Sequence, residues 1–171
     1  MKARLKVGPV IDSKTFRSVL GRYPTGVCVI TSRQPDSQPI GMSVSSFSSV
    51  SLDPPLVAFF PDRRSTTWPR IRATSRFCVN VLGDHQEAIS RRFATPAADK
   101  FSGISHRTSG LGLPILDGVV AWIDCQLHAV HKAGDHFIVV GEVASLAAED
   151  AAQPLLFHQG GYAQLSRMGV A

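Results

Sequence analysis

Two long β-rich runs joined by a short connection are the feature that most constrains the fold of this chain. The runs are VVAWIDCQLHAV (119–130) and HFIVVGEVASLA (136–147), and both are rich in the β-branched and aromatic residues that favour strands. The connection contains KAGD, whose glycine and short length are typical of a hairpin. We therefore expect these two strands to pair in antiparallel fashion.

Three shorter β-rich runs precede this pair. They are VCVIT (27–31), LVAFF (56–60) and FCVNVL (77–82). Because strands outnumber helices and do not alternate strictly with them, the pattern favours an antiparallel barrel with added helices over a doubly wound parallel sheet.

Short helical segments are expected at three places. The first lies in 13–23 with Ser13 as its N-cap, since apolar residues recur there at helical spacing: Phe16, Val19, Leu20 and Tyr23. The second begins near 65–67. The third spans 84–93, where Asp84 and the glutamate three residues later resemble a capping box.

The length of the chain suits one domain. Its 171 residues, 44% of them hydrophobic, can bury one core but hardly two, so 1–171 is predicted to be a single domain. Segment 94–118 is rich in Pro, Gly and Ser, and we interpret it as a functional loop. The sequence contains no apolar run long enough for a membrane span and no secretory signal pattern at residue 1, which predicts a cytoplasmic protein.

The cysteines and histidines do not form a metal-site pattern. Cys28, Cys78 and Cys125 lie far apart without a CxxC pair, each in an apolar stretch, so they are expected to be reduced thiols in the core. His128 and His131 should point to opposite faces of one strand, which makes a shared metal ion an unfavourable interpretation. No metal site is predicted.

The formal charge of +5 requires that an anionic partner be considered. The basic residues are scattered, and aromatic residues do not alternate with them as in a single-strand-binding surface. A nucleotide phosphate is therefore a better candidate than nucleic acid, for which no binding is predicted.

Serine is concentrated in GMSVSSFSSVSLDPP (41–55), at positions Ser43, Ser45, Ser46, Ser48, Ser49 and Ser51. Short hydroxyl side chains leave backbone N–H groups accessible, which suits close approach of a flat, polar heteroaromatic ring. The alternative is a solvated edge strand. The segment by itself does not decide between the two.

Two smaller features could contribute to the same site. RRSTTW (63–68) places hydroxyls at the start of an expected helix, which suits either an anion or ordinary N-capping. GDH (134–136) places His136 beside the expected hairpin, where it could contact a ligand or be only a turn residue.

The order of the segments resembles the short-chain flavin reductase family, the reductase half of two-component flavin-dependent monooxygenases. The resemblance runs from about Phe16 to Leu165. It rests on TGVCVIT, GMSVSSFSSVSLDPPLV, STTW, RFCVNVL, RRFA, KFSG, GLPIL, DCQL, AGDHFIVVGEV and PLLFHQGGY, in that order. It implies a mainly β, α+β fold: an antiparallel Greek-key split β-barrel of the FMN-binding type with a few peripheral helices.

The resemblance also implies roles for residues. The flavin ring and ribityl chain would lie along Ser43, Val44, Ser45 and Ser46, and the rim would include Ser51 and Asp53. The flavin phosphate would be held by Ser65 and Thr67, with Arg91, Arg92 and Lys100 as candidate cations. His136 would contact the nicotinamide nucleotide, and Tyr162 would close the site. No protein side chain is expected to be catalytic, because flavin itself accepts the hydride.

By this resemblance the chain is expected to be an NAD(P)H:flavin oxidoreductase. It would bind FMN or FAD at a homodimer interface, accept hydride from NADH or NADPH, and release reduced flavin to a partner monooxygenase. Two alternatives stay open: a flavoprotein with tightly bound FMN that reduces another acceptor, such as a metal chelate or nitroaromatic compound, and a non-catalytic flavin-binding module.

Overall fold

The computed structural model describes residues 11–97, 99–149 and 153–166. Strands dominate it, as expected. They are β1 (Thr25–Gly26), β2 (Cys28–Arg33), β3 (Pro39–Val44), β4 (Ser48–Leu52), β5 (Pro55–Phe59), β6 (Arg76–Val81), β7 (His106–Thr108), β8 (Pro114–Leu116), β9 (Ala121–Ala133), β10 (His136–Ala148), β11 (Leu155–His158) and β12 (Gly161–Gln164).

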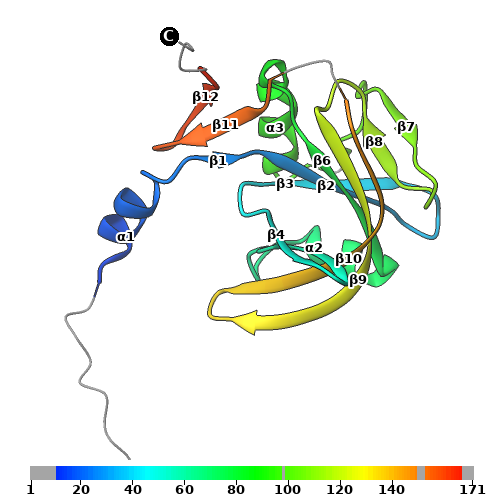
Figure 1. Cartoon of the computed structure of the whole chain (residues 1–171), viewed down its shortest axis with the longest axis horizontal. Coiled ribbons are helices and arrows are strands. Elements are labelled where there is room, and N and C mark those ends of the chain that lie inside the picture. Colours follow the sequence, from blue (N-terminus) through cyan, green and yellow to red (C-terminus); the bar gives the residue numbers. More distant parts are fainter. Residues whose placement is uncertain (1–10, 98, 150–152, 167–171) are drawn as a thin grey trace, which may run out of the picture.

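A seven-stranded sheet in the order β3-β2-β6-β9-β10-β5-β4 forms the body of the molecule (Figure 1). Every pairing within it is antiparallel, and the predicted hairpin of β9 and β10 is confirmed. These results confirm the mainly β, antiparallel fold.

The two edges of this sheet are consecutive in the sequence. β3 and β4 lie at opposite ends of the strand order, yet only residues 45–47 connect them. Four peptide steps span at most about 14 Å, so the sheet has to curl until its edges approach each other. The serine-rich connection therefore lies where the barrel is split. β3 presents an unpaired backbone edge there.

The helices lie at the places expected, with different caps. α1 (Ser13–Leu20) is capped by Asp12, not by Ser13: the Asp12 carboxylate accepts hydrogen bonds from the backbone N–H groups of Lys14 and Thr15, at 3.0 and 2.9 Å. The second expected helix is α2 (Trp68–Thr74).

The third helical segment is divided into a 3-10 turn, η1 (Asp84–Gln86), and α3 (Glu87–Ala94). The predicted capping box of Asp84 and Glu87 is wrong. The Gln86 side chain instead accepts a hydrogen bond from the Gly83 N–H at 2.8 Å, so the side-chain contact lies one residue earlier, at the initial 3-10 turn.

Segment 94–118 is less of a loop than predicted. Its second half forms the β7–β8 hairpin, and Leu113, Ile115 and Leu116 are buried. The buried Asn80 side chain accepts a hydrogen bond from the Leu116 N–H, which ties β8 to the barrel. Only the first half remains available to line a site.

The core contains the three cysteines, as expected. Cys28, Cys78 and Cys125 are buried and free. Burial raises the pKa of the Cys28 and Cys125 thiols to about 12, and it also raises the pKa of Cys78. The thiols are therefore protonated near neutral pH and are poor nucleophiles.

α1 differs from the other helices because its apolar side is not buried. It extends to one side of the barrel next to β1 (Figure 1). Phe16, Val19 and Leu20 are each more than half exposed, and Tyr23 just beyond the helix is also exposed. No helix in the described part of the chain is long and apolar enough to cross a membrane.

Candidate functional site

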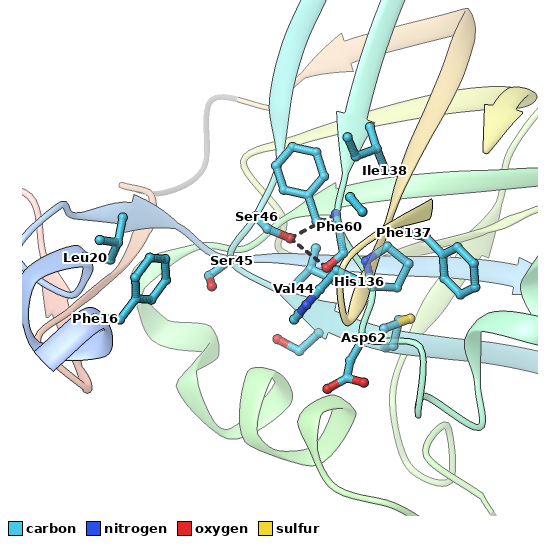
Figure 2. Close-up of a pocket in the computed structure, with 14 residues that line it drawn as sticks. Phe16, Leu20, Val44, Ser45, Ser46, Phe60, Asp62, His136, Phe137 and Ile138 are labelled. Carbon is cyan, nitrogen blue, oxygen red and sulfur yellow. Dashed lines mark hydrogen bonds between the residues drawn. The ribbon is translucent and has the colours of Figure 1, made fainter. Parts of the chain in front are cut away.

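A groove of about 790 Å³ opens beside the split in the barrel (Figure 2). One wall is the end of β3 with the connection to β4, where Ser43, Val44, Ser45 and Ser46 lie side by side in the sequence. The end of β5 and the start of β10 adjoin this connection, and Phe16 and Leu20 of α1 lie on the other side (Figure 2). The lining thus combines hydroxyl groups with apolar side chains. The apolar lining consists of Phe16, Leu20, Met42, Phe60, Pro61, Ala133, Phe137 and Ile138.

A second cavity, of about 640 Å³, continues from the groove toward α2 and α3. It shares Met42, Ser43 and Asp62 with the groove. Its own lining is more polar and more cationic: Arg64, Ser65, Thr66, Thr67 and Lys100, with Phe93, Ala94 and Pro96. An elongated ligand with a flat ring at one end and an anion at the other would fit this pair of cavities.

Ser43 lies at the junction of the cavities. It lines the groove, the second cavity and a third, smaller cavity of about 190 Å³ behind β3. Its hydroxyl oxygen is 3.0 Å from that of Ser90 on α3. The Ser90 oxygen is in turn 2.9 Å from the Tyr162 hydroxyl on β12.

Gly41 explains how α3 comes so close to β3. A Cβ atom on Gly41 would lie 2.7 Å from the ring of Phe93, so any side chain there would push α3 away. Gly41 and Ser43 share one face of β3, and Ser90 and Phe93 share one face of α3. The missing side chain at Gly41 therefore allows the contact between Ser43 and Ser90.

His136 stands at the mouth of the groove (Figure 2). Its Nδ1 donates to the Asp135 carboxylate at 2.8 Å, which leaves Nε2 available for a ligand. This contact lowers the pKa of the Asp135 carboxyl group. Two carboxylates, Asp135 and Asp62, thus lie near the imidazole ring.

Asp62 and Arg64 form an exposed ion pair at the rim between the two cavities. Asp62 accepts hydrogen bonds from the Arg64 side chain, the shortest at 2.8 Å, and from its backbone N–H at 2.7 Å. These contacts hold the pKa of Asp62 well below its usual range. They also fix the Arg64 guanidinium group beside the second cavity.

Lys100 brings a half-buried positive charge into the second cavity. Its ammonium group donates to the Phe93 carbonyl oxygen at 2.9 Å, and burial together with nearby Arg70 lowers the pKa of Lys100. Among the described residues, no carboxylate lies within ion-pair distance of it. A bound anion would offset both unfavourable effects.

Two of the predicted hydroxyl groups also accept hydrogen bonds from the backbone. The Ser46 oxygen accepts from the Phe60 N–H at 3.1 Å and so joins the serine connection to the end of β5 (Figure 2). The Ser65 oxygen accepts from the Trp68 N–H at 3.1 Å and caps α2. Thr67 makes no side-chain cap contact, so within the described residues its hydroxyl is not used to cap α2.

Four predicted residues do not line these cavities in the described part of the chain. Ser51 and Asp53 lie at the end of β4 and in the turn to β5. Arg91 forms an ion pair with Glu87 and covers the Tyr162 ring, with its guanidinium carbon 4.8 Å from the ring centroid. Arg92 lies beside it on α3.

Several lining residues had no sequence prediction. Met42 and Ile138 could have been found from strand periodicity, because each lies two residues from a predicted site residue, Val44 or His136, and so shares its face of the strand. The ion pair of Asp62 with Arg64 and the buried Ser90 carry no such signal, since each acts through contacts that only the folded chain makes.

The chain matches the family model described as flavin reductase like domain over residues 20–166. It is 56% identical over 156 residues to a flavin reductase of Pseudomonas putida, covering 91% of this chain and 92% of that one. It is 49% identical over 154 residues to the reductase subunit HsaB of a flavin-dependent monooxygenase of Mycobacterium tuberculosis, with coverage of 89% and 82%. An NADH-dependent FMN reductase, SmoA of Agrobacterium fabrum, is 40% identical over 156 residues, with coverage of 91% and 88%.

Solved structures agree with this similarity. Nitrilotriacetate monooxygenase component B of Mycobacterium thermoresistibile superposes with a TM-score of 0.86 at 46% identity, covering 90% of this chain and 86% of that one. The NADH:FAD oxidoreductase SgcE6 of Streptomyces globisporus, solved with NAD and FAD fragments, has a TM-score of 0.85 at 34% identity, with coverage of 93% and 98%.

Proposed function

This chain belongs to the flavin reductase-like domain family and is a flavin reductase, and we propose that it reduces FMN or FAD in the serine-lined groove with NADH and releases the product to a monooxygenase. The observation that carries this assignment to particular residues is the continuous pair of cavities that meet at Ser43.

The flavin ring fits the groove by shape and by chemistry. A volume of about 790 Å³ lies within the range of small-molecule sites. The unpaired edge of β3 offers backbone groups from Ser43 to Ser46 to the polar edge of a flat ring. Phe137 and Ile138 add apolar surface to the same groove.

The flavin phosphate belongs in the second cavity. Thr67 contributes a hydroxyl, Lys100 a half-buried ammonium group and Arg64 a guanidinium group held by Asp62. Ser65 adds a further hydroxyl. Arg91 is engaged with Glu87 and Tyr162, so we assign the phosphate contact to Lys100 instead.

The chain's own task in the reaction is to bind and orient. The two bound molecules supply the redox chemistry: a hydride leaves the dihydronicotinamide ring for the flavin ring, nicotinamide leaves oxidised, and a solvent proton completes the reduced flavin. His136 holds the nicotinamide nucleotide through Nε2 at the mouth of the groove, and the apolar wall keeps water from the facing rings.

A second copy of the chain is the partner that we propose for α1. The exposed apolar residues Phe16 and Leu20 also line the groove, so a copy that packed on α1 would border the flavin site. Sedimentation should show a dimer at micromolar concentration, and Val19→Asp should weaken it.

Consumption of NADH and the protonated buried thiols are consistent with a cytoplasmic location.

The function is tested by mixing the purified protein with NADH and FMN, FAD or riboflavin and following NADH oxidation. We expect oxidation that requires both protein and flavin, together with loss of flavin on gel filtration. A rate equal to that of the protein-free control would contradict the enzyme assignment. Tightly retained flavin would contradict release to a partner.

Replacing His136 with alanine should weaken NADH binding selectively. We expect the KM for NADH to rise about tenfold while the KM for FMN changes less than about twofold, because the variant removes the ring nitrogen that we assign to the nicotinamide nucleotide and leaves the second cavity intact. His128→Ala, on the exposed part of β9, is the matched control. Equal increases for both substrates would show that the contact is misplaced. Steady-state kinetics with each substrate varied gives the answer.

Replacing Lys100 with glutamine should weaken binding of FMN about tenfold and leave riboflavin, which has no phosphate, unchanged. The reason is that the variant removes a charge from the second cavity and leaves the groove intact. Fluorescence titration of both flavins measures this difference, with the exposed Lys14→Gln as control. If riboflavin lost as much affinity as FMN, Lys100 would not be a phosphate ligand.

A further inference from the structure

We propose that Ser90 and Tyr162 are positioning residues that direct the Ser43 hydroxyl as a hydrogen-bond donor toward the bound flavin ring. This inference rests on the proposed function. It is carried by the chain of three hydroxyl groups that runs from the groove through α3 to β12, with oxygen separations of 3.0 Å between Ser43 and Ser90 and 2.9 Å between Ser90 and Tyr162.

Burial of the middle hydroxyl restricts how the protons can be arranged. Ser90 is 1% exposed, and among the described residues its hydroxyl has only Ser43 and Tyr162 within hydrogen-bond distance. A hydroxyl group has one proton to donate. If both neighbours donated to Ser90, its own proton would be buried without an acceptor, which is costly. Ser90 therefore accepts from one neighbour and donates to the other.

Two arrangements remain, and the chemistry of the ends favours one of them. A phenol is a stronger hydrogen-bond donor than an aliphatic alcohol. The Arg91 guanidinium group, 4.8 Å from the centre of the Tyr162 ring, increases this tendency by withdrawing electron density. Tyr162 therefore donates to Ser90, and Ser90 donates to Ser43.

In this direction the Ser43 proton is not used between the three hydroxyl groups, and it is free to point toward a ligand. Ser43 lines the groove, and the proposal makes the flavin ring bound there the acceptor of this free proton. Hydride transfer to a flavin places negative charge on the ring, and a fixed donor stabilises that charge more than it stabilises the neutral starting state. The hydroxyl chain thus acts on the rate more than on binding.

The arrangement also gives Arg91 and Tyr162 a role that their positions would otherwise not explain. Both lie away from the two larger cavities, and Tyr162 borders only the small cavity behind β3. They reach the flavin through Ser90. The pairing of Arg91 with Glu87 keeps the guanidinium group over the ring.

The test uses Tyr162→Phe, Ser90→Ala and the double variant, with steady-state kinetics on FMN and on riboflavin. We expect each single variant to lower kcat about three- to tenfold while the flavin KM stays within about twofold. The double variant should be no worse than the poorer single variant, because both substitutions break the same chain. The loss in kcat should be equal for FMN and riboflavin, since the three hydroxyl groups act on the flavin ring and not on the phosphate.

A matched control separates this role from a structural one. Ser32→Ala removes a buried hydroxyl group that bonds to Thr74 and to the Arg76 carbonyl, outside the cavities. It should keep the wild-type kcat. Tyr162→Phe keeps the ring under Arg91 and against Phe157, so it preserves the packing.

Three results would overturn the proposal. One is a wild-type kcat in Tyr162→Phe. Another is a double variant whose loss equals the product of the single losses. The third is a loss confined to FMN. In each of these cases the wild type remains an active flavin reductase. A wild type that oxidises no NADH with flavin would instead refute the proposed function, and the hydroxyl chain would fall with it.

Discussion

Replacing Ser43 with tryptophan should lower the affinity for FMN at least about 100-fold, because the new side chain occupies space that the ligand needs. Ser43 borders all three cavities at the split of the barrel, so an indole group there enters the groove, the second cavity or the small cavity in any rotamer. Riboflavin should lose affinity as well, since the obstruction lies at the ring. Fluorescence titration with both flavins measures the effect.

The controls for this variant separate obstruction from misfolding. Ser43→Ala leaves the cavities open and removes only the hydroxyl group, so it should cost less than about tenfold in affinity. Leu52→Trp introduces the same indole group at a side chain that is 94% exposed at the end of β4, and it should bind FMN like the wild type. Normal FMN affinity in Ser43→Trp, with an unchanged melting temperature, would mean that the flavin does not lie along β3.

The Ser43 site shows which part of the function could be predicted from the sequence. The density of hydroxyl groups between residues 41 and 55 left a ligand surface and a solvated edge strand as alternatives, and in the structure Ser43, Ser45 and Ser46 line the groove. Hydroxyl composition is local information. The contact of Ser43 with Ser90 joins residues 47 positions apart, so no spacing in the sequence could indicate it.

The strands show the same division between local and distant information. The runs of β2, β5 and β6 carry their own signal because most of their residues are buried, and β9 and β10 carry one because β-branched and aromatic residues recur along them. β3 and β4 were not predicted as separate strands. Both are edge strands with Gly or Ser at many positions, and their conformation depends on the neighbours they pair with.

The prediction of Ser13 as the N-cap of α1 was wrong for a different reason. Asp12 and Ser13 are both good N-cap residues, so the sequence permits either start, and the carboxylate of Asp12 wins by accepting two backbone N–H groups. The family resemblance made Arg91 one candidate cation for the phosphate. Its position on α3 instead points it to Glu87 and Tyr162. Side-chain direction on a helix depends on how the helix is packed.

Trp68→Ala should lower the free energy of unfolding by about 3–5 kcal/mol, the range for removal of a fully buried large aromatic side chain. Trp68 is 2% exposed, and its ring packs edge-to-face on Phe59 at 5.7 Å and lies 6.5 Å from Phe137. For a chain of this length the loss corresponds to a decrease in melting temperature of about 6–20 °C. Denaturant titration and a thermal melt measure it.

The effect should reach the site because Trp68 supports both of its ends. Its backbone N–H is held by Ser65 beside the second cavity, and its ring lies near Phe137, which follows His136 in β10. We therefore expect the KM values for NADH and FMN to rise together in Trp68→Ala, unlike in His136→Ala. The exposed Leu52→Ala is the control and should change stability by less than about 0.5 kcal/mol. A loss below about 1 kcal/mol in Trp68→Ala would contradict the packing of α2 against the barrel, and with it the rigid support that we assign to the phosphate end of the site.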